Sequence, residues 1–387
     1  MRRLLTFLTA FVLVLASLGI GLFTADLPFW RRAFEWPPQP AGIYLPAAEI
    51  GDAARGVGEA PVLDPAVDSR IVEEAVKLAR NAGSRALLVM HRGHLQVERY
   101  FGLDDGNTLM PAGLFARPLA AMAAGVALAE GRVASLDTPV ARYLHEWEGD
   151  ARGRITMRQL LEDTSGLESG GADARALLDE SAWRDPARLP RFATSRGVRL
   201  LLGNDLESTA LGFKLDHEPG GFHTESPVNS QLIALIVERA TGTPYEQFLD
   251  ERLWRPAGAG TARLQLDRRA GMPAAHCCWL AAPRDMLRIA SLLTNDGMVG
   301  GVRVLPEGWT ATMAAPSRVD ARIGMQLTRI AFGDAHFLRA ADAQGSAFWV
   351  APQLGLVVLD IAGEGGMSTP EVPKLLTRAF GLSGPVD

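Results

Sequence analysis

Apolar and polar residues alternate with two different periods along this chain of 387 residues. A helical period that begins near polar residues and stops before a glycine predicts a helix over 66–81. Two apolar runs on either side of a glycine turn at 91–94 predict a hairpin over 86–102. Strand patterns return only near the C-terminus, and they predict strands at 337–341, 347–351 and 355–361, before a closing helix at 370–380.

The middle of the chain, from about 107 to 300, has a mostly helical pattern. Helices are predicted at 119–130, 156–162, 230–241, 245–253 and 282–295. Strands that come early and late, with a helical block between them, predict an α+β architecture in which both ends of the chain share one antiparallel sheet. The crevice between this sheet and the helical lobe is where a ligand site is expected.

The first 25 residues predict export. Two arginines precede an uncharged run at 4–23, and about 20 helical residues at about 1.5 Å each cover the roughly 30 Å hydrocarbon core of a membrane. We expect an uncleaved transmembrane anchor, with the domain facing the periplasm or the cell exterior. A signal peptide cleaved near Gly21 or Ala25 is the alternative. Residues 26–65 are rich in proline, glycine and alanine and predict an extended linker, so the folded domain is expected at 66–387.

Composition narrows the range of partners. The net charge is −5 and no basic patch is interleaved with aromatic residues, so no nucleic acid is expected. No glycine-rich phosphate loop and no metal-ligand spacing occurs, so neither a cofactor nor a metal is expected. The two cysteines, Cys277 and Cys278, are adjacent. A disulfide between neighbours is strained and two cysteines cannot complete a four-ligand zinc site, so we expect two small buried apolar side chains.

A set of short motifs runs in order from residue 131 to residue 309. The segments are 131–140, 143–144, 154–161, 164–167, 219–220, 229–232, 240–242, 283–285, 295–297 and 305–309. This ordered set resembles the β-lactamase-related serine hydrolases, which include class C β-lactamases, D,D-peptidases, esterases and 6-aminohexanoate-oligomer hydrolases. The resemblance covers about 66–385. It implies a β-lactamase/transpeptidase-like fold, in which an antiparallel sheet is flanked by helices and joined to a helical lobe.

The resemblance also implies a Ser-x-x-Lys motif, whose serine attacks an acyl carbon while the lysine helps to remove its proton. At these positions the chain has Leu114 and Arg117. Leu114 carries no nucleophilic atom, and Arg117 stays protonated and therefore cannot act as the base. None of the three lysines in the chain follows a serine by three positions. The chemistry expected of this motif is therefore missing.

Two further motifs of the family are also altered. The positions of its Tyr-x-Asn motif hold Glu225 and Pro227. The positions of its Lys-Thr-Gly or His/Tyr-x-Gly motif hold Ala343 and Gly345, with no cation between them. The loss of all three motifs predicts a catalytically inactive homologue with a binding or regulatory role. Its ligand, a small molecule or a peptide, would lie in the cleft between the lobes.

Other interpretations of the same residues remain. Glu225 is a candidate general base for the hydrolysis of an amide, ester or peptide bond, provided that burial raises its pKa. The interpretation that we favour pairs Glu225 with Arg117 in an ion pair that fills the inactive site. A relic with no selected activity is a third possibility. The candidate replacement nucleophiles, none of which has an evident base beside it in the sequence, are Ser165, Ser226 and Ser346.

Overall fold

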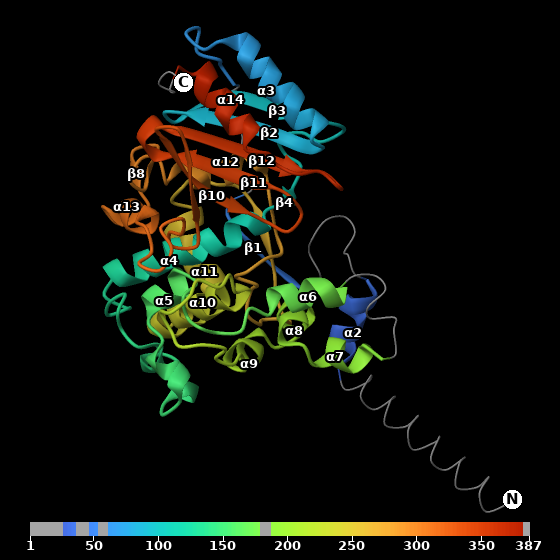
Figure 1. The fold of residues 1–387 in the computed structure, drawn as a ribbon, viewed down its shortest axis with the longest axis vertical. Coiled ribbons are helices and arrows are strands. Elements are labelled where there is room, and N and C mark those ends of the chain that lie inside the picture. The colour runs from blue at the N-terminus through green and yellow to red at the C-terminus, as the bar shows by residue number, and fades with distance from the viewer. Residues whose placement is uncertain (1–25, 36–45, 53–60, 179–186, 382–387) are drawn as a thin grey trace, which may run out of the picture.

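The computed structural model describes residues 26–35, 46–52, 61–178 and 187–381, and its largest sheet has six antiparallel strands (Figure 1). The strand order is β3-β2-β12-β11-β10-β9. The two ends of the domain meet in this sheet, because Val358 of β12 pairs with Val89 of β2. The strands are β2 (Ser84–His91), β3 (His94–Tyr100), β9 (Thr328–Phe332), β10 (Ala335–Ala341), β11 (Ala347–Ala351) and β12 (Leu356–Ala362).

Side chains of this sheet point alternately to two helical layers. Leu87 packs in the apolar cluster beneath α3 (Ser69–Asn81) and α14 (Glu371–Ala379), whereas Leu88 packs in the larger core shared with the helical lobe. The helix α12 (Pro283–Ser291) covers this second face. Figure 1 shows α3 and α14 together on one side of the sheet and the helical lobe on the other. The predicted early hairpin, late strands and closing helix are confirmed.

The helical lobe is built around α4 and α10, which pack against each other. Thr156 begins α5 with a reciprocal capping box to Gln159, and Gly242 ends α10 in the left-handed conformation at φ +70°. The helices of this lobe are α4 (Ala116–Ala129), α5 (Met157–Leu161), α6 (Gly171–Leu178), α7 (Leu189–Thr194), α8 (Arg196–Leu202), α9 (Leu206–Leu211), α10 (Pro227–Thr241) and α11 (Tyr245–Leu249). The short helix α13 (Trp309–Ala314) follows later in the chain.

A second sheet, of four strands in the order β1-β5-β6-β4, joins the helical lobe to the rest. The backbone N–H of Ala112 donates to the carbonyl of Trp279 at 2.8 Å and so fixes the chain just before α4. The region 107–300, predicted to be mostly helical, therefore also contains strands. They are β4 (Met110–Pro111), β5 (Ala262–Gln265), β6 (Trp279–Ala281) and the start of a small hairpin, β7 (Met298–Val299) with β8 (Val302–Arg303).

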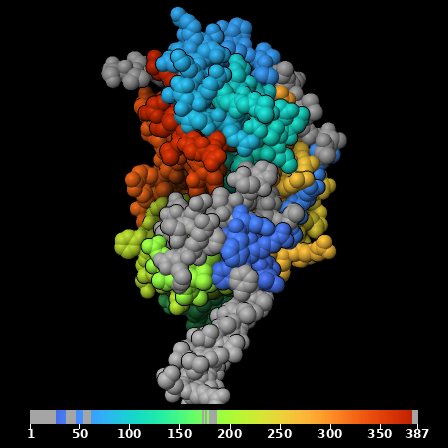
Figure 2. All heavy atoms as spheres, turned by 90° about the vertical axis from the view of Figure 1, so that its right-hand side faces the viewer, coloured from blue at the N-terminus to red at the C-terminus, as the bar shows by residue number. Residues whose placement is uncertain are grey.

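The segment expected as an extended linker, 26–65, differs from that expectation where the structure describes it. It contains α2 (Leu27–Phe34) and the strand β1 (Ala47–Ile50), which pairs with β5. Phe29 is fully buried, and the buried Arg32 donates to the carbonyls of Gly203 at 2.5 Å and Asp267 at 2.7 Å. In Figure 2 α2, in blue, lies beside the green helices of the lobe. The described residues of α2 and β1 are part of the folded domain, because Phe29 and Arg32 are buried against the lobe and β1 pairs with β5.

The predicted membrane anchor at 4–23 lies outside the described residues. Within the part of the chain that the structure describes, no helix has both the length and the apolar character needed to cross a membrane.

Candidate functional site

The position expected for the family's nucleophile lies in a 3₁₀ turn, Gly113–Phe115, that leads directly into α4. Leu114 is 2% exposed and Phe115 is 1% exposed. The ring of Phe115 stacks on Phe348 of β11, with ring centroids 4.7 Å apart. Apolar side chains therefore fill the space where the helical lobe meets the sheet, at the point where a nucleophile would have to meet its substrate.

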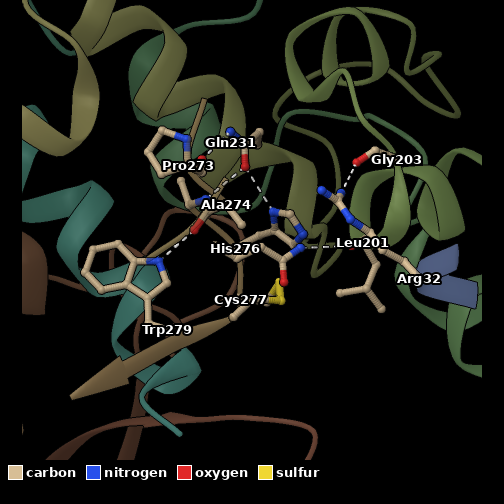
Figure 3. The surroundings of a disulfide bond; sticks show 12 residues. Arg32, Leu201, Gly203, Gln231, Pro273, Ala274, His276, Cys277 and Trp279 are labelled. Carbon is tan, nitrogen blue, oxygen red and sulfur yellow. Dashed lines mark hydrogen bonds between the residues drawn. A yellow bond between two sulfur atoms is a disulfide. The ribbon is translucent and has the colours of Figure 1, made fainter. Parts of the chain in front are cut away.

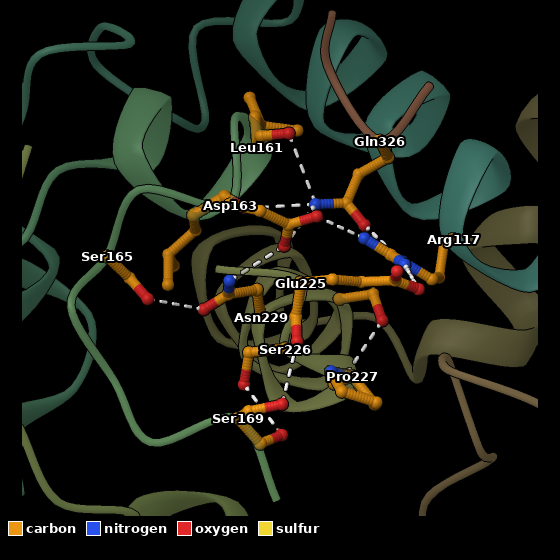
Figure 4. A network of polar contacts seen from close by, with 12 residues as sticks. Arg117, Leu161, Asp163, Ser165, Ser169, Glu225, Ser226, Pro227, Asn229 and Gln326 are labelled. Atoms are coloured by element: carbon orange, nitrogen blue, oxygen red, sulfur yellow. Dashed lines mark hydrogen bonds and ion pairs between the residues drawn. The ribbon is translucent and has the colours of Figure 1, made fainter. Parts of the chain in front are cut away.

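Arg117, the second residue of α4, belongs to a polar network (Figure 4). Its Nη1 donates to Oε1 of Glu225 at 2.7 Å, its Nε donates to Oε1 of Gln326 at 2.8 Å, and its Nη2 pairs with Asp163. The Arg117 side chain is 20% exposed, whereas that of Asp163 is 4% exposed and that of Glu225 is 67% exposed. The guanidinium thus joins a buried carboxylate to one at the surface.

Asp163 is the buried end of this network. It follows α5 and has a φ of +54°, a conformation that a residue other than glycine rarely adopts. Asn229 of α10 donates its amide to Oδ1 of Asp163 at 2.8 Å, and the hydroxyl of Ser165 donates to Oδ1 of Asn229 at 2.7 Å. Burial raises the pKa of Asp163, while the charge of Arg117 and the hydrogen bond from Asn229 oppose that rise. A buried carboxylate of this kind needs its cation close by.

Gln326 closes the network from the other side. Its φ is +57°, and its amide nitrogen donates to the carbonyls of Leu160 at 3.0 Å and Leu161 at 3.1 Å. These two donated bonds turn its amide oxygen toward Nε of Arg117. Both Gln326 and Asp163 therefore hold Arg117 with backbone geometry that is uncommon for their residue types.

Glu225 and Pro227 lie at the start of α10. Pro227 is the first residue of the helix. A backbone N–H at this position would have no acceptor within the helix, so proline, which lacks one, is well tolerated there. The hydroxyl of Ser226 donates to the carbonyl of Glu168 at 2.9 Å, and the carbonyl of Glu225 accepts from the hydroxyl of Ser169 at 3.0 Å. Because its side chain is mostly exposed and contacts Arg117, Glu225 does not lie in the apolar pocket that the general-base interpretation requires.

The comparisons with known proteins agree with this arrangement of a sheet and a helical lobe. A family model described as Beta-lactamase matches residues 69–362. The chain belongs to the beta-lactamase family. The family and the α+β fold expected from the sequence are confirmed.

Individual relatives in the beta-lactamase family are distant. The 6-aminohexanoate-dimer hydrolase of Paenarthrobacter ureafaciens is 26% identical over 322 residues, which cover 77% of this chain and 74% of that protein. A Bacillus anthracis structure assigned as a 6-aminohexanoate-dimer hydrolase has a TM-score of 0.69 at 17% identity, over 90% of this chain and 92% of that one. A D-stereospecific amidohydrolase from Streptomyces sp. has a TM-score of 0.57 at 17% identity, over 79% and 98%. The similarity to these solved structures shows the fold alone.

The two residues assigned to the third motif of this beta-lactamase-family chain, Ala343 and Gly345, lie in the turn between β10 and β11. Ala343 is exposed. Gly345 has a φ of +94°, and a Cβ there would lie 2.4 Å from the carbonyl oxygen of Gly366. The described contacts of Ala343 and Gly345 stay within this turn and the adjacent segment around Gly366. Neither residue joins the network around Arg117. From β10, it is instead Arg339 whose charge interacts with Glu225.

The adjacent cysteines do not match their prediction. Cys277 and Cys278 form a disulfide with each other, and both are only partly buried against the core. The expectation of two buried thiols failed because strain was taken to prevent a bond between neighbours, whereas Cys278 adopts a φ of +66° in the bonded pair. His276 precedes them, and burial, helped by the charge of Arg117, lowers the pKa of His276 to about 3. No group of three metal-binding side chains is found among the described residues.

The sequence did not identify three members of the site. Asp163 stands directly before the Thr164-Ser165-Gly166 motif, and that position was the only signal available for it. Asn229 served as a landmark for counting and was not assigned a contact. Nothing in the segment around Gln326 marks it as part of a site. A recess of about 280 Å³ lies elsewhere, over α8, α9 and the residues between them.

Proposed function

We propose that this protein is a non-catalytic member of the beta-lactamase family, exported and anchored to the membrane, with a binding or regulatory role. The observation that carries the proposal is the state of Arg117, whose guanidinium is held by Asp163, Glu225 and Gln326. In a working Ser-x-x-Lys site this position must supply a base beside a nucleophile. Here it supplies a fixed cation beside a buried leucine.

The candidate replacement serines support the same proposal. A nucleophilic hydroxyl needs a base within hydrogen-bond reach and access to its substrate. Ser165, Ser226 and Ser346 are all buried. Ser165 donates to an amide oxygen and Ser226 to a main-chain carbonyl, while Ser346 accepts the N–H of Ala362 at 3.1 Å. The partners of Ser165 and Ser226 are not bases. The hydroxyl of Ser346 also interacts with the carboxylate of Asp342, but Ser346 is 1% exposed, which keeps a substrate away from it.

The enzymatic alternative would make the chain a hydrolase of amide, ester or peptide bonds, and similar proteins are named as hydrolases. It depends on Glu225 acting as a base on water. The pairing of Glu225 with Arg117 and its exposure argue against that role, because the carboxylate is held by a cation at the surface and does not lie in a closed site that could hold a water molecule against it. Because Leu114 and Phe115 fill the space between the lobe and the sheet, the binding role that we propose places a small molecule or a peptide at the outer edge of this boundary, where the exposed side of Glu225 is available to it.

The decisive experiment is a search for an acyl-enzyme. Purified full-length protein is treated with a fluorescent penicillin and with a fluorophosphonate, and its hydrolysis of nitrophenyl esters and anilides is measured beside an active class C β-lactamase. We expect no covalent label and no hydrolysis above background. An adduct mapped by mass spectrometry to a serine, and lost when that serine is replaced by alanine, would overturn the proposal.

Hydrolysis without an adduct is a separate outcome. If it disappears in Glu225→Gln, the general-base alternative is correct and the non-catalytic assignment is wrong. If it persists in Glu225→Gln and in alanine variants of Ser165, Ser226 and Ser346, the non-catalytic assignment is still wrong and the active residue lies elsewhere.

A further inference from the structure

The Cys277–Cys278 disulfide lies next to the turn that carries Leu114, and nothing in the network around Arg117 uses it. We propose that this pair is a reversible redox site: a dithiol reductant opens the disulfide, and its state sets the conformation of the Gly113–Phe115 turn. The proposal does not depend on whether the Leu114 site is catalytic, since it concerns a bond in the wall of the site and no step of acyl transfer.

The bond is poorly suited to stabilising the fold. A disulfide stabilises a protein mainly by restricting the unfolded chain, and the restriction grows with the number of residues in the closed loop. The sequence separation of Cys277 and Cys278 is 1, so the closed loop contains only the two cysteines. Their bond therefore acts on the local backbone and leaves the rest of the unfolded chain unrestricted.

The chain on both sides of the pair is fixed (Figure 3). Gln231 donates to the carbonyl of Pro273 at 3.1 Å and accepts the N–H of Ala275 at 2.9 Å. On the other side, the indole of Trp279 donates to the carbonyl of Ala274 at 2.7 Å. Because these bonds involve neither cysteine, they persist when the disulfide opens. A change of redox state is therefore confined to the two cysteines and what they touch.

The backbone of Cys278 is the part that responds. Its φ of +66° lies in the left-handed region, which side chains other than glycine disfavour. The disulfide ties Cys278 to Cys277 in that conformation. Once the bond is broken, the tie is gone and Cys278 is free to return to an ordinary φ. The carbonyl of Cys278, which accepts the N–H of Gln265 at 3.1 Å, would then turn away from its present partner.

The pair is placed to pass such a change to the site. A Cβ built on Gly113 would lie 3.5 Å from the backbone nitrogen of Cys278 and 3.8 Å from Cα of Cys277, so the two backbones face each other closely. The backbone carbonyl of Trp279, the residue after Cys278, accepts the N–H of Ala112 at 2.8 Å. Movement of Cys278 therefore acts on the chain immediately before Leu114.

The chemistry is ordinary thiol–disulfide exchange. A thiolate of the reductant attacks one sulfur and releases the other as a thiolate, forming a mixed disulfide; the second thiol of the reductant then displaces the protein sulfur. The protein gains two electrons and two protons as two thiols, and the reductant becomes a disulfide. A disulfide oxidant reverses both steps. Both cysteines are partly exposed, as attack on either sulfur requires.

The first test counts thiols in folded, full-length protein. The protein is oxidised with diamide, and N-ethylmaleimide labelling is compared before and after dithiothreitol treatment without denaturant, by intact mass. We expect no labelled thiol before reduction, two after it, and none again after reoxidation. Two free thiols after diamide treatment would overturn the proposal. So would a disulfide that dithiothreitol opens only when urea has unfolded the protein.

The second test measures the coupling by hydrogen exchange of a peptide covering 110–118. Reduction should speed its exchange several-fold, while a peptide from α14 stays unchanged. The variant Cys277→Ser/Cys278→Ser should exchange as the reduced protein does. The variant Cys277→Ser/Cys278→Gly should stay close to the oxidised protein, because glycine adopts a positive φ without a disulfide. Equal exchange in oxidised and reduced wild-type protein would disprove the coupling, whether or not either variant folds.

Discussion

Nη1 of Arg117 lies 2.7 Å from Oε1 of Glu225, although 108 positions separate the two residues in the sequence. This contact is the ion pair expected from the resemblance. The structure adds that Glu225 is only the outer partner of the arginine, since Asp163 holds the same guanidinium from the buried side. The two carboxylates therefore contribute differently to stability, which the sequence alone did not indicate.

Arg117→Met should destabilise the fold strongly, and Glu225→Gln should destabilise it weakly. Removing Arg117 leaves the buried Asp163 without its cation, which typically costs about 3–5 kcal/mol. Glu225 is mostly exposed, and breaking an exposed pair costs about 0–1 kcal/mol. Urea unfolding of both variants measures the difference. Arg263→Met is the matched control, because it removes an arginine that pairs with the exposed Glu49 at 2.8 Å. Equal losses in Arg117→Met and Arg263→Met would contradict this account.

A double-mutant cycle should show that Arg117 and Asp163 act as a unit. Asp163→Asn leaves Arg117 partly buried without its inner carboxylate, and Arg117→Met leaves the reverse. Residues in one buried network usually couple by about 0.5–3 kcal/mol, so the double variant should lose less than the sum of the two single losses. The free energies of unfolding of the four proteins give the coupling. Additive losses would mean that the two side chains do not depend on each other.

The sequence predicted those parts of the fold that depend on local pattern. The helix at α3, the hairpin of β2 and β3, and the short helix at α5 all follow from periodicity and turn chemistry over a few neighbouring residues. The strands β4 and β6 escaped prediction because they have two and three residues, too few to show an alternation. They exist because they pair with each other across a long stretch of chain.

The candidate site could be predicted only in part, for a similar reason. Arg117 and Glu225 were found by counting from family motifs, which fixes positions but not burial. Asp163 and Gln326 meet because each takes a positive φ and because the chain brings residue 326 back to residue 163. Neither the φ values nor this long-range contact leaves a local trace in the sequence. The disulfide between Cys277 and Cys278 was missed for a different reason, because strain was taken to prevent a bond between neighbouring residues.

Asp342 should make stability fall as the pH rises from about 4 to about 6. Burial raises the pKa of Asp342 to about 6, above the value of about 3.9 expected in the unfolded chain. Between these two values the folded state binds more protons than the unfolded state, so the contribution of Asp342 is present below pH 4 and is lost as the pH passes 6.

Asp342→Asn removes this titration while keeping the shape of the side chain. The difference in unfolding free energy between variant and wild type should therefore change between pH 4 and pH 7, with the variant gaining relative to wild type at the higher pH. Urea unfolding at several pH values measures it. A difference that stays constant across this range would show that Asp342 titrates alike in both states.

The anchor prediction is checked at the N-terminus of the mature protein. An uncharged run at 4–23 behind Arg2 and Arg3 should stay attached and hold the protein in the membrane fraction after a carbonate wash. Edman sequencing or terminal-peptide mass spectrometry reads the first residue directly. A mature chain that begins after residue 20 would establish the signal-peptide alternative instead.

Gly345→Ala should destabilise the turn between β10 and β11 more than a positive φ alone explains. At Gly345 the φ is +94° and a Cβ would lie 2.4 Å from the carbonyl oxygen of Gly366, so the backbone itself must move. Gly333 provides the control, since its φ is +58° and a Cβ there meets nothing within 4 Å. Gly333→Ala should cost only the conformational penalty, about 1 kcal/mol, and Gly345→Ala should cost about 2 kcal/mol or more. Thermal and urea unfolding of the pair measure this difference. Similar costs for the two variants would mean that the turn shifts without resistance, and Gly345 would then be needed for its φ alone.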